Sequence, residues 1–194
     1  MTTPNEIDVA LMQRVKAGDE DAFRELIERH QRAVISVIYR ALGDAWESED
    51  LAQRVFIQVF RSARRYQPTA KFTTWLYTIT HNAIRNEYRR RGRHAAESFD
   101  ALTQPGETGE PGAQLADPQA IDPGQIVIER ELQEQIQAAV QLLPETQRTA
   151  VILCRFEGLP YEEIATVLNC SVSAVKSLLH RARETLKEKL RGYY

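Results

Sequence analysis

A single stretch, residues 95–125, separates two parts of this chain that differ from it in composition. It holds eight prolines and glycines and few large apolar side chains, so it cannot bury a core and is predicted to be a flexible linker. On both sides of it the apolar residues recur at the three- to four-residue spacing of helices, without strand-like alternation. The sequence therefore predicts an all-α fold, with one small helical domain at residues 1–94 and another at residues 126–194.

Four helices are predicted in the first domain. The longest of them has a good N-cap in Asp19 and a good C-terminal stop in Gly43. The fourth is predicted to run from about residue 73 to residue 91. A loop at residues 66–72 precedes it, because a proline interrupts the apolar pattern there.

The second domain is predicted to end in a helix-turn-helix. Residues 161–168 form the first helix, Asn169 suits a left-handed turn, and Ser171 can cap the second helix. The second helix of such a motif enters the major groove, so its polar face is predicted to bind duplex DNA. The alternative is a solvated basic face on an ordinary helical hairpin. The face consists of Ser173, Lys176, Ser177, His180, Arg181 and Arg183.

Another polar face lies on the predicted helix at residues 73–91. Its asparagines and threonines can bond to the edges of unpaired bases, and rings at Tyr66, Phe72 and Tyr77 can stack on a flipped base. The arginines supply phosphate contacts. The sequence leaves open the alternative that the aromatic rings are core and the arginines merely solvated. The face consists of Thr74, Tyr77, Thr78, His81, Asn82, Arg85, Asn86 and Arg89, and it continues into Arg90, Arg91 and Arg93.

The residue pattern argues against catalysis. The two cysteines and four histidines have no spacing suited to a metal, so neither a metal nor another cofactor is expected. There is no phosphate-binding glycine loop and no nucleophile–base arrangement, and acidic pairs such as Glu162–Glu163 and Glu47 with Glu49 are interpreted as solvated helix starts. An enzyme acting on a small-molecule substrate is therefore not expected. No apolar run reaches the roughly 18 residues of a membrane span and no signal peptide is visible, so a cytoplasmic protein without membrane insertion is expected.

Four stretches, in this order, resemble the extracytoplasmic-function (ECF) sigma factors of bacterial RNA polymerase. They are EDLAQRVFIQVF (49–60), KFTTWLYTITHNAIRNEYRRRGR (71–93), LPETQRTAVILCRFEGLPYEEIA (143–165) and SAVKSLLHRARETL (173–186). The resemblance runs from about Ala22 to Leu190 outside the linker, and it implies two helical domains, sigma-2 and sigma-4. The first would bind the clamp helices of core polymerase and melt the −10 promoter element. The second would bind the −35 element and the flap tip of the core, and an anti-sigma factor is a further implied partner.

The resemblance and the two polar faces together assign roles to particular residues. The predicted −10 set is Tyr66, Lys71, Phe72, Thr74, Tyr77, Thr78, Asn82, Arg85, Asn86 and Arg89. The predicted −35 set is Ser171, Ser173, Lys176, Ser177, His180, Arg181 and Arg183. The residues predicted to bind core polymerase are Asp50, Gln53, Arg54, Val55 and Phe56.

Three positions depart from the family pattern. Arg54 stands where members usually carry glutamate, which reverses a charge on the helix predicted to bind polymerase. Leu178 stands where arginine is frequent, so one DNA contact is missing from the expected set. Pro160 replaces a common serine and removes its capping hydroxyl.

The predicted function is that of an alternative sigma factor, which directs core polymerase to promoters and has no catalysis of its own. Promoter opening would follow from capture of an unstacked base. The alternative is a stand-alone helix-turn-helix regulator with an N-terminal helical sensor domain, in which the asparagine and arginine face would be incidental.

Overall fold

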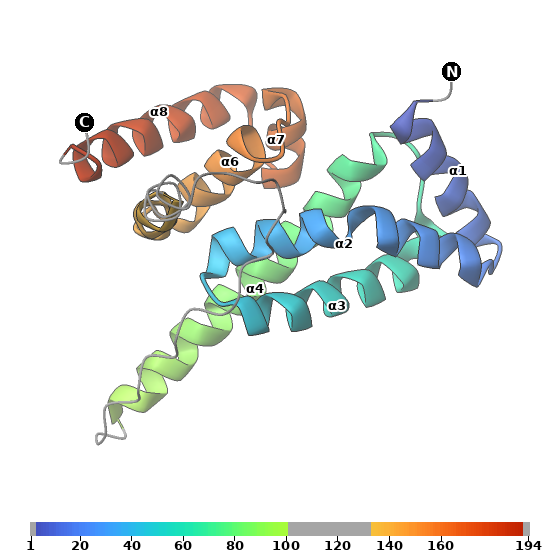
Figure 1. Ribbon diagram of the computed structural model, residues 1–194, viewed down its shortest axis with the longest axis horizontal. Coiled ribbons are helices and arrows are strands. Elements are labelled where there is room, and N and C mark those ends of the chain that lie inside the picture. The colour runs from blue at the N-terminus through green and yellow to red at the C-terminus, as the bar shows by residue number, and fades with distance from the viewer. Residues whose placement is uncertain (1–2, 101–132, 192–194) are drawn as a thin grey trace, which may run out of the picture.

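The computed structural model in Figure 1 describes residues 3–100 and 133–191, and all regular structure in these ranges is helical. The prediction of an all-α fold is confirmed. The elements are α1 (Pro4–Lys16), α2 (Glu20–Leu42), α3 (Ala45–Ser62), the short 3-10 turn η1 (Ala63–Arg65), α4 (Phe72–Asp100), α6 (Glu145–Arg155), α7 (Tyr161–Leu168) and α8 (Val172–Lys189). Residues 133–141 form a further helical segment before α6.

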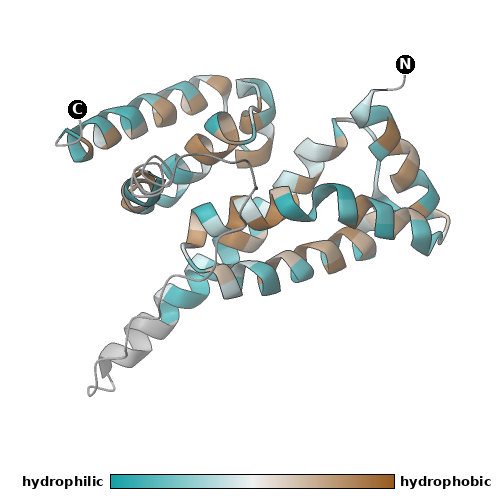
Figure 2. Cartoon of the chain, viewed as in Figure 1, coloured by the Kyte–Doolittle hydropathy of each residue, from teal (hydrophilic) through white to brown (hydrophobic). Residues whose placement is uncertain are grey.

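Helices α1 to α4 make the N-terminal bundle, and its helix ends follow the predicted chemistry. The carboxylate of Asp19 accepts a hydrogen bond from the backbone N–H of Ala22 at 3.0 Å, which caps α2. Gly43 ends α2 with φ of +77°, a conformation that favours glycine. Apolar and hydrophilic positions alternate along each helix in Figure 2, and the apolar faces meet in the bundle.

Helix α4 continues to Asp100, nine residues beyond its predicted end at Arg91. No proline occurs between Pro68 and Pro105, and a single glycine inside a helix, here Gly92, costs only about 1 kcal/mol. The helix therefore includes the first residues of the predicted linker. The rest of that linker, and residues 126–132 at the start of the predicted second domain, lie outside the described residues.

The C-terminal half contains the predicted helix-turn-helix in α7 and α8. Asn169 adopts the left-handed conformation at φ of +51°, and the Ser171 hydroxyl accepts from the N–H of Ala174 at 3.1 Å. Pro144 is the N-cap of α6. Pro160 is the N-cap of α7, which begins without a side-chain cap.

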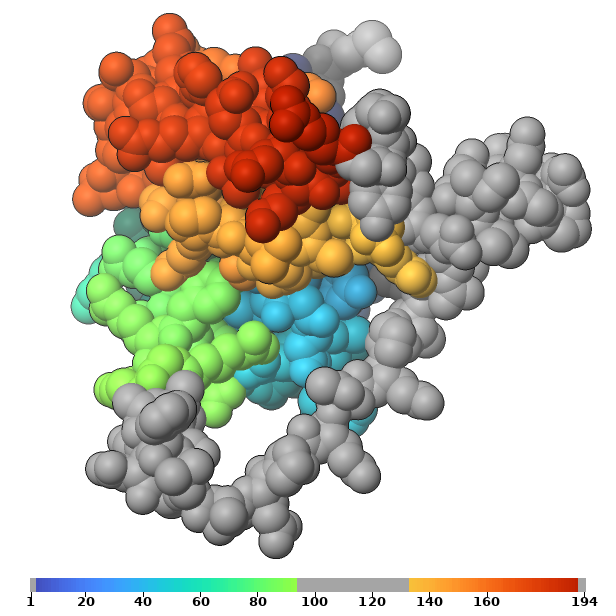
Figure 3. All heavy atoms as spheres, turned by 90° about the vertical axis from the view of Figure 1, so that its left-hand side faces the viewer, coloured from blue at the N-terminus to red at the C-terminus, as the bar shows by residue number. Residues whose placement is uncertain are grey.

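The two halves lie against each other, with α6 next to α2 and α7 next to α4. Figure 3 shows the C-terminal half, orange to red, stacked on α4 in green and on the end of α2 in light blue. Arg148 of α6 donates to the carbonyl oxygen of Ala41 at 2.7 Å and to the hydroxyl of Tyr88 at 2.6 Å. Gln141 adds a bond from its amide to the carbonyl of Arg40 at 2.8 Å.

A buried ionic cluster fixes α1 to α2. Asp8 is buried, and its carboxylate accepts from Arg29 at 2.8 Å and lies 3.1 Å from Nε2 of His30. Burial by itself would raise the pKa of Asp8, but His30 and Arg29 together outweigh it and hold that pKa below its usual value. The ionised carboxylate is therefore the form that stabilises the fold.

We expect Asp8→Asn to lower the free energy of unfolding by about 2 kcal/mol at pH 7, because a buried charged acceptor is lost. The folded pKa is below the unfolded one, so this contribution is present above about pH 4 and disappears as pH falls through the folded pKa. Urea unfolding at several pH values measures it. The difference between wild type and variant should shrink below about pH 4, whereas exposed Asp21→Asn should change stability by less than about 0.5 kcal/mol throughout.

Candidate nucleic-acid interface

The outer face of α8 is free to meet a partner. The serines, lysine, histidine and arginines of the predicted −35 set are all exposed, while Val175 and Ala182 are buried on the opposite side of the same helix. The turn at Asn169 and the cap at Ser171 hold α8 across α7. Leu178, where an arginine is frequent in the family, is half-buried beside this face.

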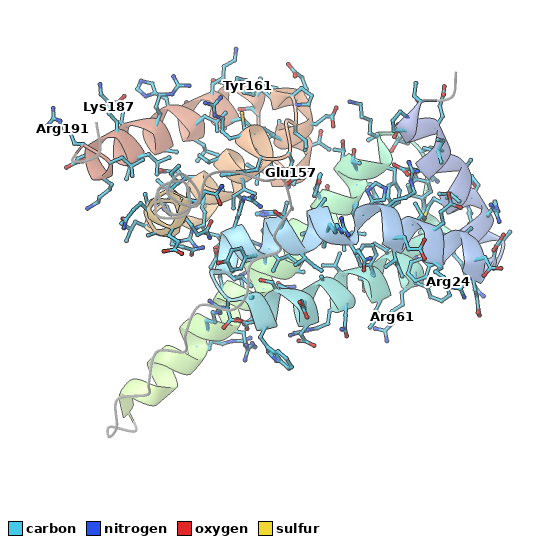
Figure 4. The ribbon with its side chains drawn as sticks, in the orientation of Figure 1. Arg24, Arg61, Glu157, Tyr161, Lys187 and Arg191 are labelled. Atoms are coloured by element: carbon cyan, nitrogen blue, oxygen red, sulfur yellow. The ribbon has the colours of Figure 1, made fainter. Side chains whose placement is uncertain are left out.

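Two bases that the sequence prediction omitted extend the same face. Lys187 and Arg191 are exposed near the C-terminal end of α8, as their labelled side chains in Figure 4 show. Lys187 lies seven residues, about two helical turns, after His180, and that spacing was visible in the sequence. The positive face therefore covers most of the length of α8.

The distal part of α4 presents a second exposed polar face. Asn82, Arg85, Asn86 and Arg89 are all exposed, and their three- and four-residue spacing places them on one side of the helix. Lys71, just before α4, is exposed as well. These five members of the predicted −10 set are accessible in the structure.

The structure corrects the expectation that Tyr66 and Phe72 offer their rings for stacking. Both rings are buried in the core, where they pack with Trp75 at centroid distances of 4.9 and 5.9 Å. Burial raises the pKa of Tyr66, and the charge of Asp8 raises it further. A base cannot reach either ring unless the core rearranges.

The proximal part of α4 faces the C-terminal half. Thr74 and Tyr77 are buried there, because the Thr74 hydroxyl donates to Glu163 at 2.7 Å and the Tyr77 hydroxyl donates to Glu157. Thr78 is half-buried. His81 is buried, and burial first and the charge of Arg85 second lower its pKa below the usual value, so its neutral form is favoured.

Two arginines assigned to phosphate contacts are paired inside the protein. Arg90 and Arg91 both bind Glu47, and both lie near the buried carboxylate of Glu87, at 2.6 and 3.7 Å. The interpretation of Glu47 as a solvated helix start is therefore wrong, and so is that of Glu163, whose side chain is 18% exposed and bonded. Glu87 lies on α4 itself, three and four residues before the two arginines, whereas Glu47 comes from α3 and could not be found from spacing alone.

A groove lies between α2 and α3, beside the residues predicted to bind polymerase. Asp50, Gln53 and Arg54 are exposed on α3, while Val55 and Phe56 are buried. Two apolar side chains beside them are exposed, Ile57 at 50% and Phe60 at 46%. The groove is lined by Phe23, Ile27, Gln31, Ile35, Glu49, Ala52, Gln53, Phe56 and Ile57, and it continues to Phe60.

Phe60 is half-exposed, although it follows the buried Phe56 by one helical turn on α3. The sequence pattern that could have indicated the groove is the run of three apolar residues Val55–Ile57, because three consecutive positions of a helix cannot all face the same core. The charge-reversed Arg54 forms an ion pair with Asp50 one turn earlier on α3. The positive charge is thus partly neutralised by a second residue of the predicted polymerase-binding set.

Within residues 3–100 and 133–191, no group of three or more potential metal-binding side chains is found. None of the described helices is long and apolar enough to span a membrane. The helix-turn-helix, the exposed asparagine and arginine face of α4 and the apolar groove together define a class of protein. It is a helical DNA-binding protein.

Comparisons with known proteins identify the family. The family model described as Sigma-70 region 2 matches residues 26–94, and Sigma-70, region 4 matches residues 133–186. The RNA polymerase sigma-H factor of Pseudomonas aeruginosa is 37% identical over 95% of this chain and 94% of its own length. The ECF RNA polymerase sigma-E factor of Escherichia coli K12 is 33% identical, over 94% of each chain.

The chain belongs to the ECF sigma factors of bacterial RNA polymerase and is an alternative sigma factor. Sigma factors act in transcription initiation. Among solved structures, CnrH in complex with the cytosolic domain of CnrY has the same fold at a TM-score of 0.69, with 22% identity over 96% of this chain and 98% of that one. RpoE of Bartonella quintana, solved with the anti-sigma factor NepR, gives a TM-score of 0.66 with 24% identity over 87% and 96%.

We expect Lys176→Ala and Arg181→Ala to weaken binding to duplex DNA and to flatten its salt dependence. Each lost phosphate contact should reduce the magnitude of the log–log salt slope by about one. Fluorescence anisotropy with a labelled duplex at several salt concentrations measures the slope. Arg61→Ala removes one positive charge at the far end of the molecule and should leave the slope unchanged. A slope unchanged in both α8 variants would exclude this face as the duplex-binding surface.

Proposed function

We propose that this sigma factor divides promoter recognition between its two halves. The exposed face of α8 binds the −35 element as duplex, through base edges near its N-terminus and phosphates farther along. The exposed face of α4, with Asn82, Arg85, Asn86 and Arg89, binds the −10 element as an opened strand. The observation that carries the proposal is the pair of exposed, chemically different faces on one chain.

The groove between α2 and α3 is the proposed docking surface for core polymerase. Partly exposed Ile57 and Phe60 supply apolar area, and exposed Asp50, Gln53 and Arg54 supply a polar rim beside them. A partner helix that covers these exposed apolar side chains removes them from water, which favours binding. Arg54 and Asp50 would then meet the partner as an ion pair, with little net charge.

In this proposal the sigma factor opens the promoter without catalytic activity of its own. Asparagine side chains supply both donors and acceptors for an unpaired base, and arginines hold the phosphates on either side of it. Capture of a base that has left the stack stabilises the open state without ATP. The site of action is the cytoplasm, where polymerase and promoter DNA are located.

An anti-sigma factor is the proposed regulator. CnrH was solved with the cytosolic domain of CnrY, and the Bartonella RpoE with NepR. These proteins share the fold of this chain over most of its length. The proposed regulator binds both halves at once.

Transcription with purified components tests the function. The chain is mixed with core polymerase, the complex is isolated, and the DNA that it retains from a genomic library is sequenced. A run-off transcript from the retained promoters, absent with core polymerase alone, is the expected result. Retained DNA without any transcript, or a footprint on palindromes without polymerase, would favour the stand-alone regulator.

Ile57→Ala is expected to weaken binding to core polymerase by about tenfold, because apolar area at the centre of an interface contributes most of the affinity. Trp46 is the matched control, since it is also apolar and is 86% exposed but does not line the groove. Trp46→Ala should leave the affinity within about twofold. Biolayer interferometry with immobilised core polymerase measures both, and equal losses would remove the groove from the proposal.

Asn82→Ala is expected to weaken binding of the single-stranded −10 element to the sigma–polymerase complex by roughly tenfold, because a hydrogen-bonded base edge is lost. Binding of a −35 duplex should not change. Gln58→Ala, an exposed amide on α3, is the control. A loss of equal size on both DNA forms would contradict a dedicated role for α4 in the opened strand.

A further inference from the structure

The loop of residues 67–71, which connects η1 to α4, is exposed in its middle and fixed in the core at both ends. All its residues are exposed, whereas the rings of Tyr66 before it and Phe72 after it are buried. Lys71, the last residue of the loop, leads directly into α4 and is an accessible member of the predicted −10 set. The conformation of this loop therefore affects how the start of α4 meets a strand of DNA.

Helix α1 lies beside the loop in Figure 1, and its Asn5 bonds to the end of the loop that enters α4. The side-chain oxygen of Asn5 accepts a hydrogen bond from the backbone N–H of Phe72 at 2.9 Å. Phe72 is the first residue of α4, and the first N–H groups of a helix have no partner within that helix. The side chain of Lys71 has only donors, so it cannot cap α4 itself. Asn5 therefore supplies this acceptor from another helix.

The other end of the loop is held by Lys16, in the last turn of α1. Nζ of Lys16 donates a hydrogen bond to the backbone carbonyl oxygen of Tyr66 at 3.4 Å. Asn5 and Lys16 are about 16 Å apart along the helix axis, at about 1.5 Å per residue. Both ends of the loop are thus attached to one helix, which fixes the distance between them.

Helix α1 can support the loop because it is itself firmly held in the bundle. A capping box between Thr3 and Glu6 closes its N-terminus around Asn5. The carboxylate of Asp8 lies 3.1 Å from His30 of α2, whose ring packs against Phe72 at a centroid distance of 5.2 Å. The helix also contributes three buried apolar side chains to the core, Leu11, Met12 and Val15.

We propose that Asn5 and Lys16 are positioning residues for −10 recognition, which hold the loop of residues 67–71 and the start of α4 in the conformation that receives an opened strand. Neither side chain has to touch the DNA. A loop that is ordered before binding loses less conformational entropy when the strand binds, which increases the affinity. The inference rests on the proposed role of α4 and gives α1 a part in it.

The test uses the complex of the full-length chain with core polymerase and a labelled single strand that carries the −10 element of a promoter giving a run-off transcript. N5A/K16M removes the acceptor and the donor, and it should weaken binding of this strand about tenfold while binding of a −35 duplex stays within about twofold. N5D/K16R retains both bonding groups and should bind the strand within about threefold of wild type. The matched control Q13A/R32M removes one exposed amide from α1 and one exposed cation from α2, and it should behave as wild type.

Amide hydrogen exchange in the free chain tests the contact independently of DNA. In N5A/K16M the amides from Thr69 to Phe72 should exchange roughly tenfold faster than in wild type, while α2 and α3 keep their protection. N5D/K16R should restore slow exchange.

The inference is overturned if exchange at these amides does not change, if it rises equally throughout the N-terminal bundle, or if N5A/K16M binds the strand as tightly as wild type does. A wild-type complex that binds the −10 strand no better than a scrambled strand would instead refute the proposed function. In that case the exchange measurement still decides whether α1 holds the loop.

Discussion

Arg148 fixes how the two halves of this sigma factor meet. Its guanidinium group donates to the carbonyl oxygens of Ala41, Gln141 and Leu143 and to the hydroxyl of Tyr88, so one side chain bonds to α2, α4 and its own half. A planar group with five N–H donors can satisfy several buried acceptors at once, which lysine cannot do. The position of α6 follows from this contact, and α7 is thereby held against α4.

Two kinds of contact coexist around α4. On one side its apolar residues pack into the N-terminal core, where the rings of Tyr66, Phe72 and Trp75 pack against one another. On the other side hydroxyl and cationic groups meet Glu157 and Glu163. Water or phosphate can replace a carboxylate, so the second kind of contact is reversible where the first is not. A DNA-binding helix can therefore be stably folded and still change partners.

Much of the fold was predictable from the sequence because it depends on local chemistry. The caps at Asp19 and Ser171, the left-handed Asn169 and the helical spacing of the apolar residues each act within a few positions of the chain. The exposed face of α8 was predictable for the same reason, since its buried stripe is regular. The extension of α4 to Asp100 was missed because composition predicted a linker from residue 95.

What the sequence determined by itself was the set of helices, the helix-turn-helix and the family, because these follow from local periodicity and from motifs in order. Only the tertiary structure decided which polar side chains are available. Tyr66 and Phe72 are core, Arg90 and Arg91 are paired with Glu47, and Glu163 binds Lys71. The physical reason is that a charged or aromatic side chain can be stable either exposed to solvent or buried against a suitable partner. Whether it is exposed or buried depends on which helix, distant in the sequence, packs against it in the folded protein.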